Sequence, residues 1–226
     1  MNLLAIETAT ETVSVALSLN GEVRELYEHA PRKHAELLLP WVETLLAEGE
    51  IGFSALDGIT YSRGPGSFTS LRIGIGIVQG LAWASDCPVI PVSSLAATAQ
   101  SAAAIGVKSA LVALDARMKE VFTASFELDH SGIMKPVDEE RVCGPADISM
   151  PANPETHGIG IGFERYEALQ MLGEQLVAVN TDVWPRASSV LELANDWLAG
   201  NQPLPAEQAQ PVYLRNDVAK KSQQQG

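Results

Sequence analysis

The residues nearest the N-terminus that could take part in chemistry follow a short apolar run. Glu7, Thr8 and Thr10 place one carboxylate beside two hydroxyls where a strand is expected to end. Such a group of oxygens can hold a hydrated metal ion and the phosphates of a nucleotide. The same threonines fit a plain turn between strands, in which they bond the backbone. We therefore take these three as candidate cofactor-binding residues, and both interpretations, weak ATP or ADP binding and a structural turn, stay open.

A similar acidic turn occurs in the second half of the chain, at Asp115-Ala116-Arg117-Met118. It contains no glycine, so backbone amides cannot easily approach a second phosphate there. A complete ATP clamp is therefore not expected. Asp115 and Arg117 are expected to form a local ion pair or a partner contact.

A glycine-rich stretch provides a candidate surface for another protein. Gly76 and Gly80 lie four residues apart in a helix expected over 67–84, and a face without side chains lets a second helix approach closely. Apolar residues nearly encircle this helix, which therefore needs cover on two sides. One side can pack on the chain's own core and the other on a partner protein; the alternative is that both pack internally. The helix expected over 33–48 adds apolar residues to the same patch. The candidate interface residues are Leu38, Trp41, Leu45, Leu71, Gly76 and Gly80.

Hydrophobic periodicity predicts an α/β protein. Asn20-Gly21 is typical of a tight hairpin turn, and Pro40 should kink the helix that contains it. The second half repeats the opening at an offset of 108 residues, which lays Asp115 over Glu7 and suggests a duplicated fold. We expect strands at 3–6, 12–19, 22–28, 57–62, 89–92, 110–114 and 120–127, and helices at 33–48, 67–84, 93–104, 163–172 and 187–198.

Composition limits the possible functions. The net charge of -13 and the pI near 4.7 make unaided nucleic-acid binding unfavourable, because phosphates would be repelled. Cys87 and Cys143 form neither a Cys-x-x-Cys pair nor a group with histidines, so no disulfide framework or zinc knuckle is expected. The N-terminus lacks a signal peptide or membrane span, so a cytoplasmic protein is expected.

Several motifs together give a specific resemblance to the TsaB family, also called YeaZ. It covers essentially the full length and is strongest over the first 120 or so residues. The motifs are Ile6-Glu7-Thr8-Ala9-Thr10, Pro31-Arg32-Lys33-His34, the stretch 62–82, Pro91-Val92-Ser93-Ser94, Leu114-Asp115-Ala116-Arg117 and Pro211-Val212-Tyr213-Leu214-Arg215-Asn216.

The resemblance implies a duplicated actin, sugar-kinase and Hsp70 ATPase-like (ASKHA) fold, with two small lobes that each hold a mixed sheet and flanking helices. The first phosphate loop of that superfamily normally reads Asp-x-Gly-x-Thr, from which Glu7 and Ala9 depart. We expect an N-terminal lobe over 1–106 that carries the partner-binding helices. We expect a C-terminal lobe over 107–226, with a final segment that returns toward the first lobe and a disordered tail at 220–226.

The resemblance also implies a function. The family assists formation of threonylcarbamoyladenosine beside the tRNA anticodon as a non-catalytic partner of TsaD, with TsaE as a further component. We expect the chain to form a homodimer when it is alone and to contact tRNA only through the complex. We expect it to require no cofactor. TsaD continues after its Pro-Val with a metal-binding His-x-x-x-His pair, whose positions here hold Ser94 and Thr98, which are poor transition-metal ligands.

Three alternatives remain at this stage. A stand-alone ASKHA-type ATPase or phosphotransferase would use Glu7, Thr8 and Thr10, but would need a glycine-rich second phosphate loop. A metallopeptidase would need at least three ligands and a general base, and no catalytic or metal residue is expected here. A chaperone-like binding module of the same fold lacks a peptide-binding domain. His34 is expected to be a surface or capping residue and not a ligand.

Overall fold

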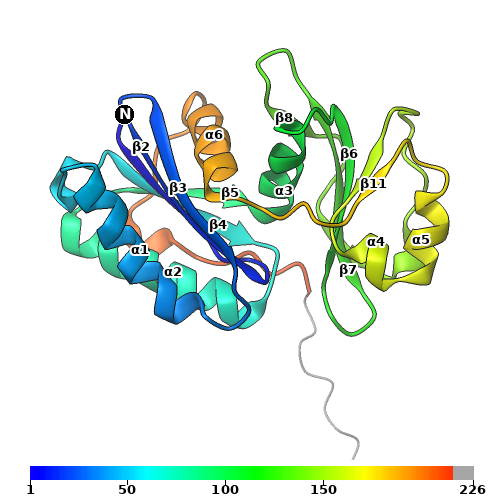
Figure 1. Ribbon diagram of the computed structural model, residues 1–226, viewed down its shortest axis with the longest axis horizontal. Coiled ribbons are helices and arrows are strands. Elements are labelled where there is room, and N and C mark those ends of the chain that lie inside the picture. The colour runs from blue at the N-terminus through cyan, green and yellow to red at the C-terminus, as the bar shows by residue number, and fades with distance from the viewer. Residues whose placement is uncertain (216–226) are drawn as a thin grey trace, which may run out of the picture.

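The computed structural model describes residues 1–215, and within them the chain forms two lobes, each built around one β-sheet (Figure 1). The predicted disordered tail at 220–226 lies outside the described residues. No described helix is long and apolar enough to cross a bilayer.

The first sheet has the strand order β3-β2-β1-β4-β5. Strands β1, β2 and β3 form an antiparallel meander, and β1, β4 and β5 run parallel to one another. The predicted hairpin turn is confirmed, since Asn20 and Gly21 have φ values of 51° and 90°. The strands are β1 (Leu3–Glu7), β2 (Thr12–Leu19), β3 (Glu22–His29), β4 (Gly58–Gly64) and β5 (Val89–Ser93).

The second sheet repeats this pattern with the order β11-β10-β6-β7-β8, and β9 also pairs with β7. As in the first sheet, the leading strand β6 is antiparallel to the strand that follows it and parallel to β10. The predicted duplication, in which each lobe holds a mixed sheet, is thereby confirmed. The strands are β6 (Ser109–Asp115), β7 (Val121–Leu128), β8 (Met134–Pro136), β9 (Arg141–Cys143), β10 (His157–Ile159) and β11 (Val179–Asn180).

The predicted offset of 108 residues needs one correction. The offset fits β1 and β6, because the Glu7 and Asp115 carboxylates each accept a hydrogen bond from the amide two residues later. Glu7 pairs with Ser14, whereas Asp115 pairs with Val121, so the second hairpin is one residue shorter. Strand β7 therefore follows β2 at an offset of 107.

Helices cover both faces of each sheet (Figure 1). Helices α1 and α2 lie on the outer face of the first sheet, and α3 and α6 fill the space between the sheets, while α4 and α5 lie on the far side of the second. Each layer encloses a cluster of buried apolar side chains. The helices are α1 (His34–Glu48), α2 (Phe68–Ser85), α3 (Ser94–Ala103), α4 (Gly162–Arg165), α5 (Glu167–Gly173) and α6 (Ala187–Leu198), with 3₁₀ turns at Phe53–Ala55, Pro145–Asp147 and Ala206–Gln208.

The C-terminal part of the chain returns to the first lobe. Helix α6 packs on β1 and β2, although it follows the second sheet in sequence. Beyond it, Leu204 pairs with Val89 of β5, and the amide of Val212 donates to the Arg63 carbonyl at 2.7 Å. The first core is thus completed by residues from both ends of the described chain, and the domain boundary at 106/107 stays a prediction.

The predicted helix over 163–172 is wrong in one respect. Tyr166 has an extended backbone conformation with φ of -125°, which divides the segment into α4 and α5. Its hydroxyl donates to Asp115 at 2.7 Å. The break in the helix thus occurs at the residue whose side chain contacts the end of β6. Pro40, in contrast, lies within α1, which is assigned as one helix throughout.

Candidate functional site

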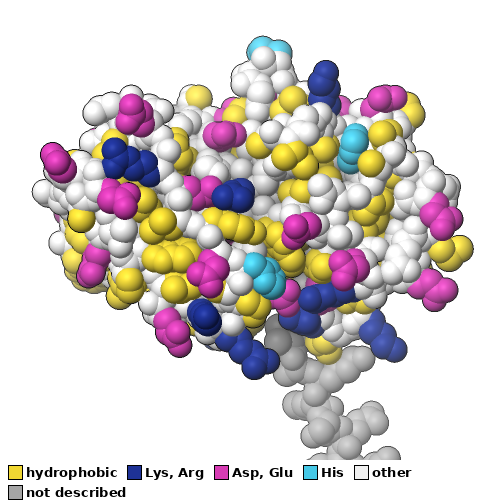
Figure 2. All heavy atoms as spheres, viewed as in Figure 1, with side chains coloured by type: hydrophobic (Ala, Val, Ile, Leu, Met, Phe, Trp, Pro, Cys, Tyr) yellow, Lys and Arg dark blue, Asp and Glu magenta, His cyan; other side chains and the backbone are white. Residues whose placement is uncertain are grey.

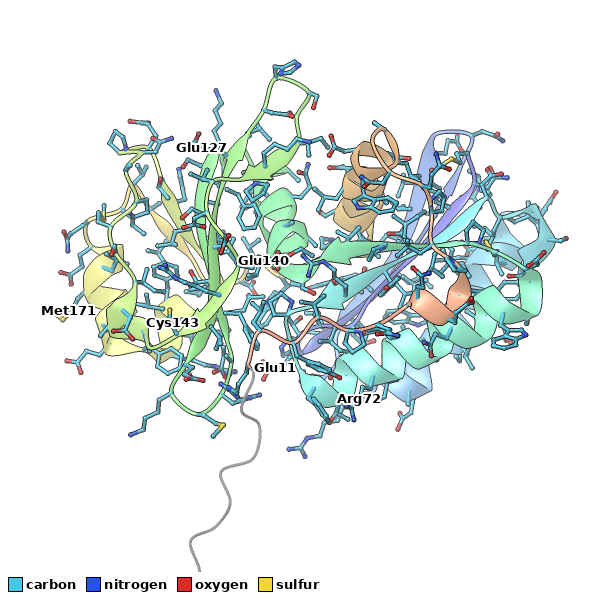
Figure 3. All side chains as sticks on the ribbon, turned by 180° about the vertical axis from the view of Figure 1, so that it is seen from behind. Glu11, Arg72, Glu127, Glu140, Cys143 and Met171 are labelled. Atoms are coloured by element: carbon cyan, nitrogen blue, oxygen red, sulfur yellow. The ribbon has the colours of Figure 1, made fainter. Side chains whose placement is uncertain are left out.

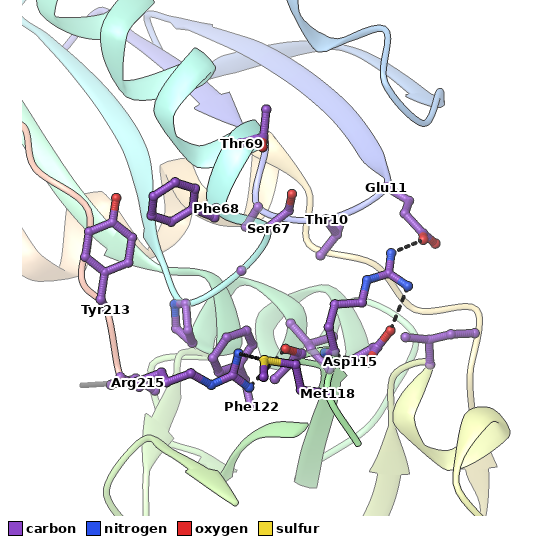
Figure 4. A pocket seen from close by; sticks show the side chains of 18 of the residues that line it. Thr10, Glu11, Ser67, Phe68, Thr69, Asp115, Met118, Phe122, Tyr213 and Arg215 are labelled. Carbon is purple, nitrogen blue, oxygen red and sulfur yellow. Dashed lines mark hydrogen bonds and ion pairs between the residues drawn. The ribbon is translucent and has the colours of Figure 1, made fainter. Parts of the chain in front are cut away.

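A cavity of about 340 Å³ lies between the lobes, where the loops after β1 and β6 face each other (Figure 4). Its walls come from both halves of the chain: the β1–β2 loop, the start of α2, the β6–β7 turn and the final described segment. The lining is mostly apolar, with a floor that we define by Leu114, Phe122 and Leu214, and it also includes Arg117, Arg165 and Arg215. The cavity can therefore enclose an apolar or aromatic group that carries negative charge.

Glu7, the acid in the candidate nucleotide loop, does not line this cavity. Its side chain is fully buried, and Oε1 accepts a hydrogen bond from the Ala9 amide at 2.5 Å. Oε2 has no partner among the described residues. Burial raises the pKa of the Glu7 carboxyl to about 7, and hydrogen bonds from Ala9, Ser62 and Thr8 only partly oppose this. At neutral pH the group is only partly ionised and is shielded from any ligand in the cavity.

The two threonines of the loop are divided between core and cavity. Thr8 is buried and packs so tightly against α2 that a Cβ on Gly74 would overlap its hydroxyl. Thr10 lines the cavity, and its carbonyl bonds Nε2 of His34 at 3.1 Å. His34 is buried, so the expectation of a surface or capping residue is wrong. Of the three candidate cofactor residues, only Thr10 can touch a ligand in the cavity.

Ion pairs join the two lobes across the mouth of the cavity. The Glu11 carboxylate of the first lobe accepts hydrogen bonds from Arg117 at 3.1 Å and from Arg165 at 3.2 Å. Asp115 pairs with both of these arginines, at 3.1 Å for Arg117, so the predicted local ion pair is confirmed. Burial disfavours the ionised Asp115, but hydrogen bonds from Tyr166, the Arg117 amide and Arg165 outweigh it and lower its pKa.

The turn that carries Arg117 has an unusual backbone. Arg117, Met118 and Lys119 have φ values of 60°, 53° and 63°, so three consecutive non-glycine residues lie in the left-handed region. Each such residue costs roughly 1 kcal/mol, and strain of this kind persists where surrounding contacts hold it. Here the Ala116 amide and Glu120 carbonyl close the turn at 3.0 Å, and Arg215 bonds both Ala116 and Glu120.

A second contact between the lobes lies at Glu140, at their junction (Figure 3). Its carboxylate accepts hydrogen bonds from Arg63 at 3.2 Å and from Ser93, whose hydroxyl also caps α3. Because Glu140 belongs to the second lobe and both donors to the first, this contact joins the two lobes, as the Glu11 contact does.

The candidate interface residues do not form one surface. Leu38, Leu45 and Leu71 are buried in the lobe, so the prediction that they contribute to an exposed patch is wrong for the single chain. Their apolar side chains point toward the sheet, because α1 and α2 bury one face each against it.

The remaining candidates are accessible. A Cβ on Gly76 or Gly80 would meet no atom within 4 Å, so both glycines face outward. Trp41 on α1 is half-buried and packs against the core of the first lobe. From Ile73 to Ser85 the helix carries no charged residue. This uncharged outer face of α2, which ends in the 77% exposed Trp83, is what an interface would use.

The two hydroxyl residues considered above as poor metal ligands are buried. Ser94 and Thr98 lie in the first turns of α3, and the Thr98 hydroxyl donates to the Ser94 carbonyl at 2.8 Å. Within residues 1–215, no group of three or more His, Cys, Asp or Glu side chains is placed to hold a metal ion.

Several cavity residues were not found from the sequence. Glu11, Arg165 and Tyr213 come from three separate segments, and only the folded chain brings them together. Arg72 does not line the cavity but holds two residues that do: its guanidinium lies 3.7 Å from the Phe68 ring centre, and its Nε donates to the Tyr213 hydroxyl at 2.9 Å. The Pro-Val-Tyr-Leu-Arg motif was the one signal that could have marked the segment of Tyr213 as part of a site.

Comparison with known proteins gives a consistent result. The family described as "TsaD: tRNA N6-adenosine threonylcarbamoyltransferase" matches residues 27–222. The "tRNA threonylcarbamoyladenosine biosynthesis protein TsaB" of Escherichia coli is 37% identical over 97% of this chain and 96% of its own length. The protein of the same name from Haemophilus influenzae is 34% identical over 96% of this chain and 95% of its own.

Solved structures agree. A Pseudomonas aeruginosa structure described as similar to peptidase YeaZ is 41% identical and superimposes with a TM-score of 0.88, covering 95% of this chain and 99% of that one. A structure described as YeaZ from the same organism is 40% identical with a TM-score of 0.86, over 94% and 99% of the two chains. Both matches extend over both lobes.

Proposed function

The chain belongs to the TsaB family of tRNA threonylcarbamoyladenosine biosynthesis proteins, and on this basis we propose that it is a non-catalytic subunit required for that modification. In this role it assists a TsaD-like catalytic subunit, together with a TsaE-like ATPase, in transferring a threonylcarbamoyl group to N6 of the adenosine next to the anticodon. It works in the cytoplasm, reaches tRNA through the complex, and forms a homodimer when alone.

The observation that carries the proposal is the similarity to TsaB over nearly the whole of both chains. The geometry supports a role without chemistry of its own, because Glu7 and Thr8 are buried away from the cavity. The outer face of α2 supports a docking role, since an uncharged helix surface in a chain of net charge -13 is suited to another protein.

The alternative is a stand-alone ATPase or phosphotransferase. It would require nucleotide phosphates to reach the loop after β1, where only Thr10 is accessible. We propose that this chain requires no cofactor, and that any binding of ATP or ADP is weak and occurs in the interlobe cavity, whose apolar floor and arginines fit an adenine nucleotide better than the buried Glu7 does.

Reconstitution of tRNA threonylcarbamoylation from purified components tests the proposal. We expect activity only when this chain and its TsaD-like partner are both present, and we expect Glu7→Gln to retain most of it. Full activity without this chain, or activity from this chain alone that Glu7→Gln abolishes, would overturn the proposal. Thr98→Ala, which alters a buried hydroxyl of α3, serves as a control for nonspecific loss of folding.

A further inference from the structure

Basic side chains are concentrated at one place on an otherwise acidic molecule. The chain has 15 Lys and Arg against 28 Asp and Glu, yet lysines and arginines gather along the lower edge of the molecule, below the junction of the lobes (Figure 2). Glu11, which lines the interlobe cavity, lies at the same edge (Figure 3). The cationic rim, as we call it, consists of Arg32, Lys33, Arg72, Arg117, Lys119, Arg165 and Arg215.

The contacts of these residues place them around one opening. Arg117, Arg165 and Arg215 line the cavity, and Lys119 belongs to the same turn as Arg117. Arg32 lies close to the opposite wall, just after Ala30, whose amide donates to the Glu11 carbonyl at 3.1 Å. Glu11 and Arg72 accordingly appear at the same edge in Figure 3, whereas Glu127 lies at the far end of the second lobe.

Four of these cations have no carboxylate partner within residues 1–215, and one of the four, Arg72, is hydrogen-bonded to Tyr213. Arg32, Lys33 and Lys119 form no ion pair there and are exposed, so they are available to a negatively charged ligand. The carboxylates of Glu11 and Asp115 in the cavity mouth are each paired with arginines. The rim is therefore locally positive, although the net charge of the molecule is negative.

Exposed aromatic rings stand within this rim. Phe68 is 46% exposed and Tyr213 41%, and their ring centres lie 5.5 Å apart. The Arg72 guanidinium lies over the Phe68 ring and bonds the Tyr213 hydroxyl, which gives it a fixed orientation. Unpaired nucleic-acid bases stack on such aromatic rings and guanidinium planes, while the surrounding cations contact phosphates.

We propose that the cationic rim is the surface through which this chain contacts tRNA inside the assembled complex. Arg32, Lys33 and Lys119 contact backbone phosphates, and an unpaired base stacks on the Phe68 and Tyr213 rings. The inference rests on the proposed function, which makes tRNA the polyanion that the complex must hold. A net charge of -13 opposes tRNA binding by the chain alone, so the rim adds its contacts to those of the catalytic subunit.

The first test neutralises two rim cations without disturbing the backbone. Arg32 and Lys119 have φ values of 70° and 63°, a region that asparagine tolerates well. For the complex carrying Arg32→Asn and Lys119→Asn, we expect several-fold weaker tRNA binding in 0.15 M salt. We also expect the slope of log affinity against log salt to become shallower by roughly one to two, about one per lost phosphate contact.

The matched control removes two exposed cations elsewhere. Lys108 precedes β6, and so lies at the opposite end of that strand from Asp115, and Arg24 pairs with Leu17 near the β2–β3 hairpin turn, at the far end of β2 from Glu11. The complex with Lys108→Asn and Arg24→Asn has the same net charge as the first variant. We expect its tRNA affinity and salt slope to equal those of the wild type.

The second test removes the stacking ring. Phe68→Leu keeps an apolar side chain at the exposed start of α2 and is expected to fold. Loss of one stacked base predicts roughly tenfold weaker binding, with an unchanged salt slope. Photo-crosslinking of tRNA that carries 4-thiouridine in the anticodon loop should attach RNA to the peptides holding Phe68 or Tyr213.

Two results would overturn the inference. The first is an affinity and salt slope for the rim variant that match the wild type. The second is a rim variant that no longer associates with the TsaD-like subunit, while tRNA binding by the other subunits is unchanged. That result would assign the rim to a protein partner. Failure of the proposed function is distinguishable, because there the wild-type chain would be dispensable for modification. A chain that is required, yet shows no effect of either rim variant on tRNA binding, contradicts this inference alone.

Discussion

At the scale of single residues, Glu7 shows how position alters what a residue type can do. A carboxylate after a strand suggests a ligand for metal or phosphate, but this one is fully buried, with one oxygen bonded to the Ala9 amide. Nothing in the sequence around Glu7 distinguishes a carboxylate that faces a cavity from one that faces the core. Its type and the strand end were predictable, and its burial was not, because burial depends on α2 and Gly74 packing over Thr8.

Glu7 should make the stability of the protein fall as pH rises. Burial raises its pKa from 4.5 to about 7, so the folded state holds the proton longer than the unfolded chain does. Folding is therefore penalised increasingly from pH 4.5 to 7, and the penalty is complete above pH 7. We expect the unfolding free energy of Glu7→Gln, relative to that of wild type, to rise by about 2–3 kcal/mol between pH 5 and pH 8. Urea titrations at both pH values measure this; an equal difference at both would contradict it.

His34 should act in the opposite direction. Burial lowers its pKa below the ordinary 6.5, although its bonds to the Thr10 and Thr12 backbone oppose this. The unfolded chain therefore binds the proton more readily, and stability is lost as pH falls below 6.5. We expect His34→Gln to cost about 1 kcal/mol at pH 8 through the weakened hydrogen bond to Thr10. Its stability profile below pH 6.5 should be flatter than that of wild type, and a profile parallel to wild type would be inconsistent with this role.

At the scale of elements, long periodic segments were predictable and short ones were not. Strand β2 and helix α6 have the predicted bounds, since eight or more residues carry a clear period of alternation or of helical spacing. Strands β8 to β11 have two or three residues each, too few to show a period. The break at Tyr166 was also missed, because it accompanies a hydrogen bond to Asp115, distant in sequence.

The two faces of α2 should respond differently to a methyl group. A Cβ on Gly74 would overlap the Thr8 hydroxyl, whereas one on Gly76 meets no atom within 4 Å. Gly74→Ala should destabilise the protein by about 1–3 kcal/mol through overpacking. Gly76→Ala should stabilise it by up to about 1 kcal/mol, because alanine favours the helix. Thermal unfolding of the pair checks both, and a loss of stability in both would mean that Gly76 is also covered.

The same outer face should govern association. Gly76→Leu places a large side chain where another helix would approach, without contact to the rest of its own lobe. We expect this variant, and Gly80→Leu, to weaken self-association or partner binding at least tenfold while the monomer stays folded. Sedimentation velocity with Gly76→Ala as the mild control measures this. Unaltered sedimentation of both leucine variants would remove the face from the interface.

At the scale of the whole molecule, the duplication was predictable, because it repeats an acidic strand end at nearly half the chain length. What the sequence did not show is how the halves exchange elements. Helix α6 packs on β1 and β2, and Leu204 pairs with β5. The interlobe cavity was equally hidden, because its walls come from segments more than 100 residues apart, as Glu11 and Arg117 show.

This exchange predicts that the first 106 residues do not fold alone. Without α6, the fully buried side chains of Leu3, Ala5 and Ala16 would face water on one side of the sheet. We expect fragment 1–106 to lack a cooperative thermal transition by circular dichroism. The same fragment joined by a flexible linker to residues 187–215 should regain one. A native-like transition in the shorter fragment would show that α6 is dispensable to the lobe.

The order of the elements along the chain also affects how the protein folds during its synthesis on the ribosome. Strand β5 ends at Ser93, but α6 begins only at Ala187. At bacterial synthesis rates, roughly 5 to 20 seconds pass between the appearance of these two elements. Throughout that interval the apolar face around Leu3 and Ala5 has been synthesised but lacks the cover of α6. The sheet that is synthesised first is therefore the last to be fully covered.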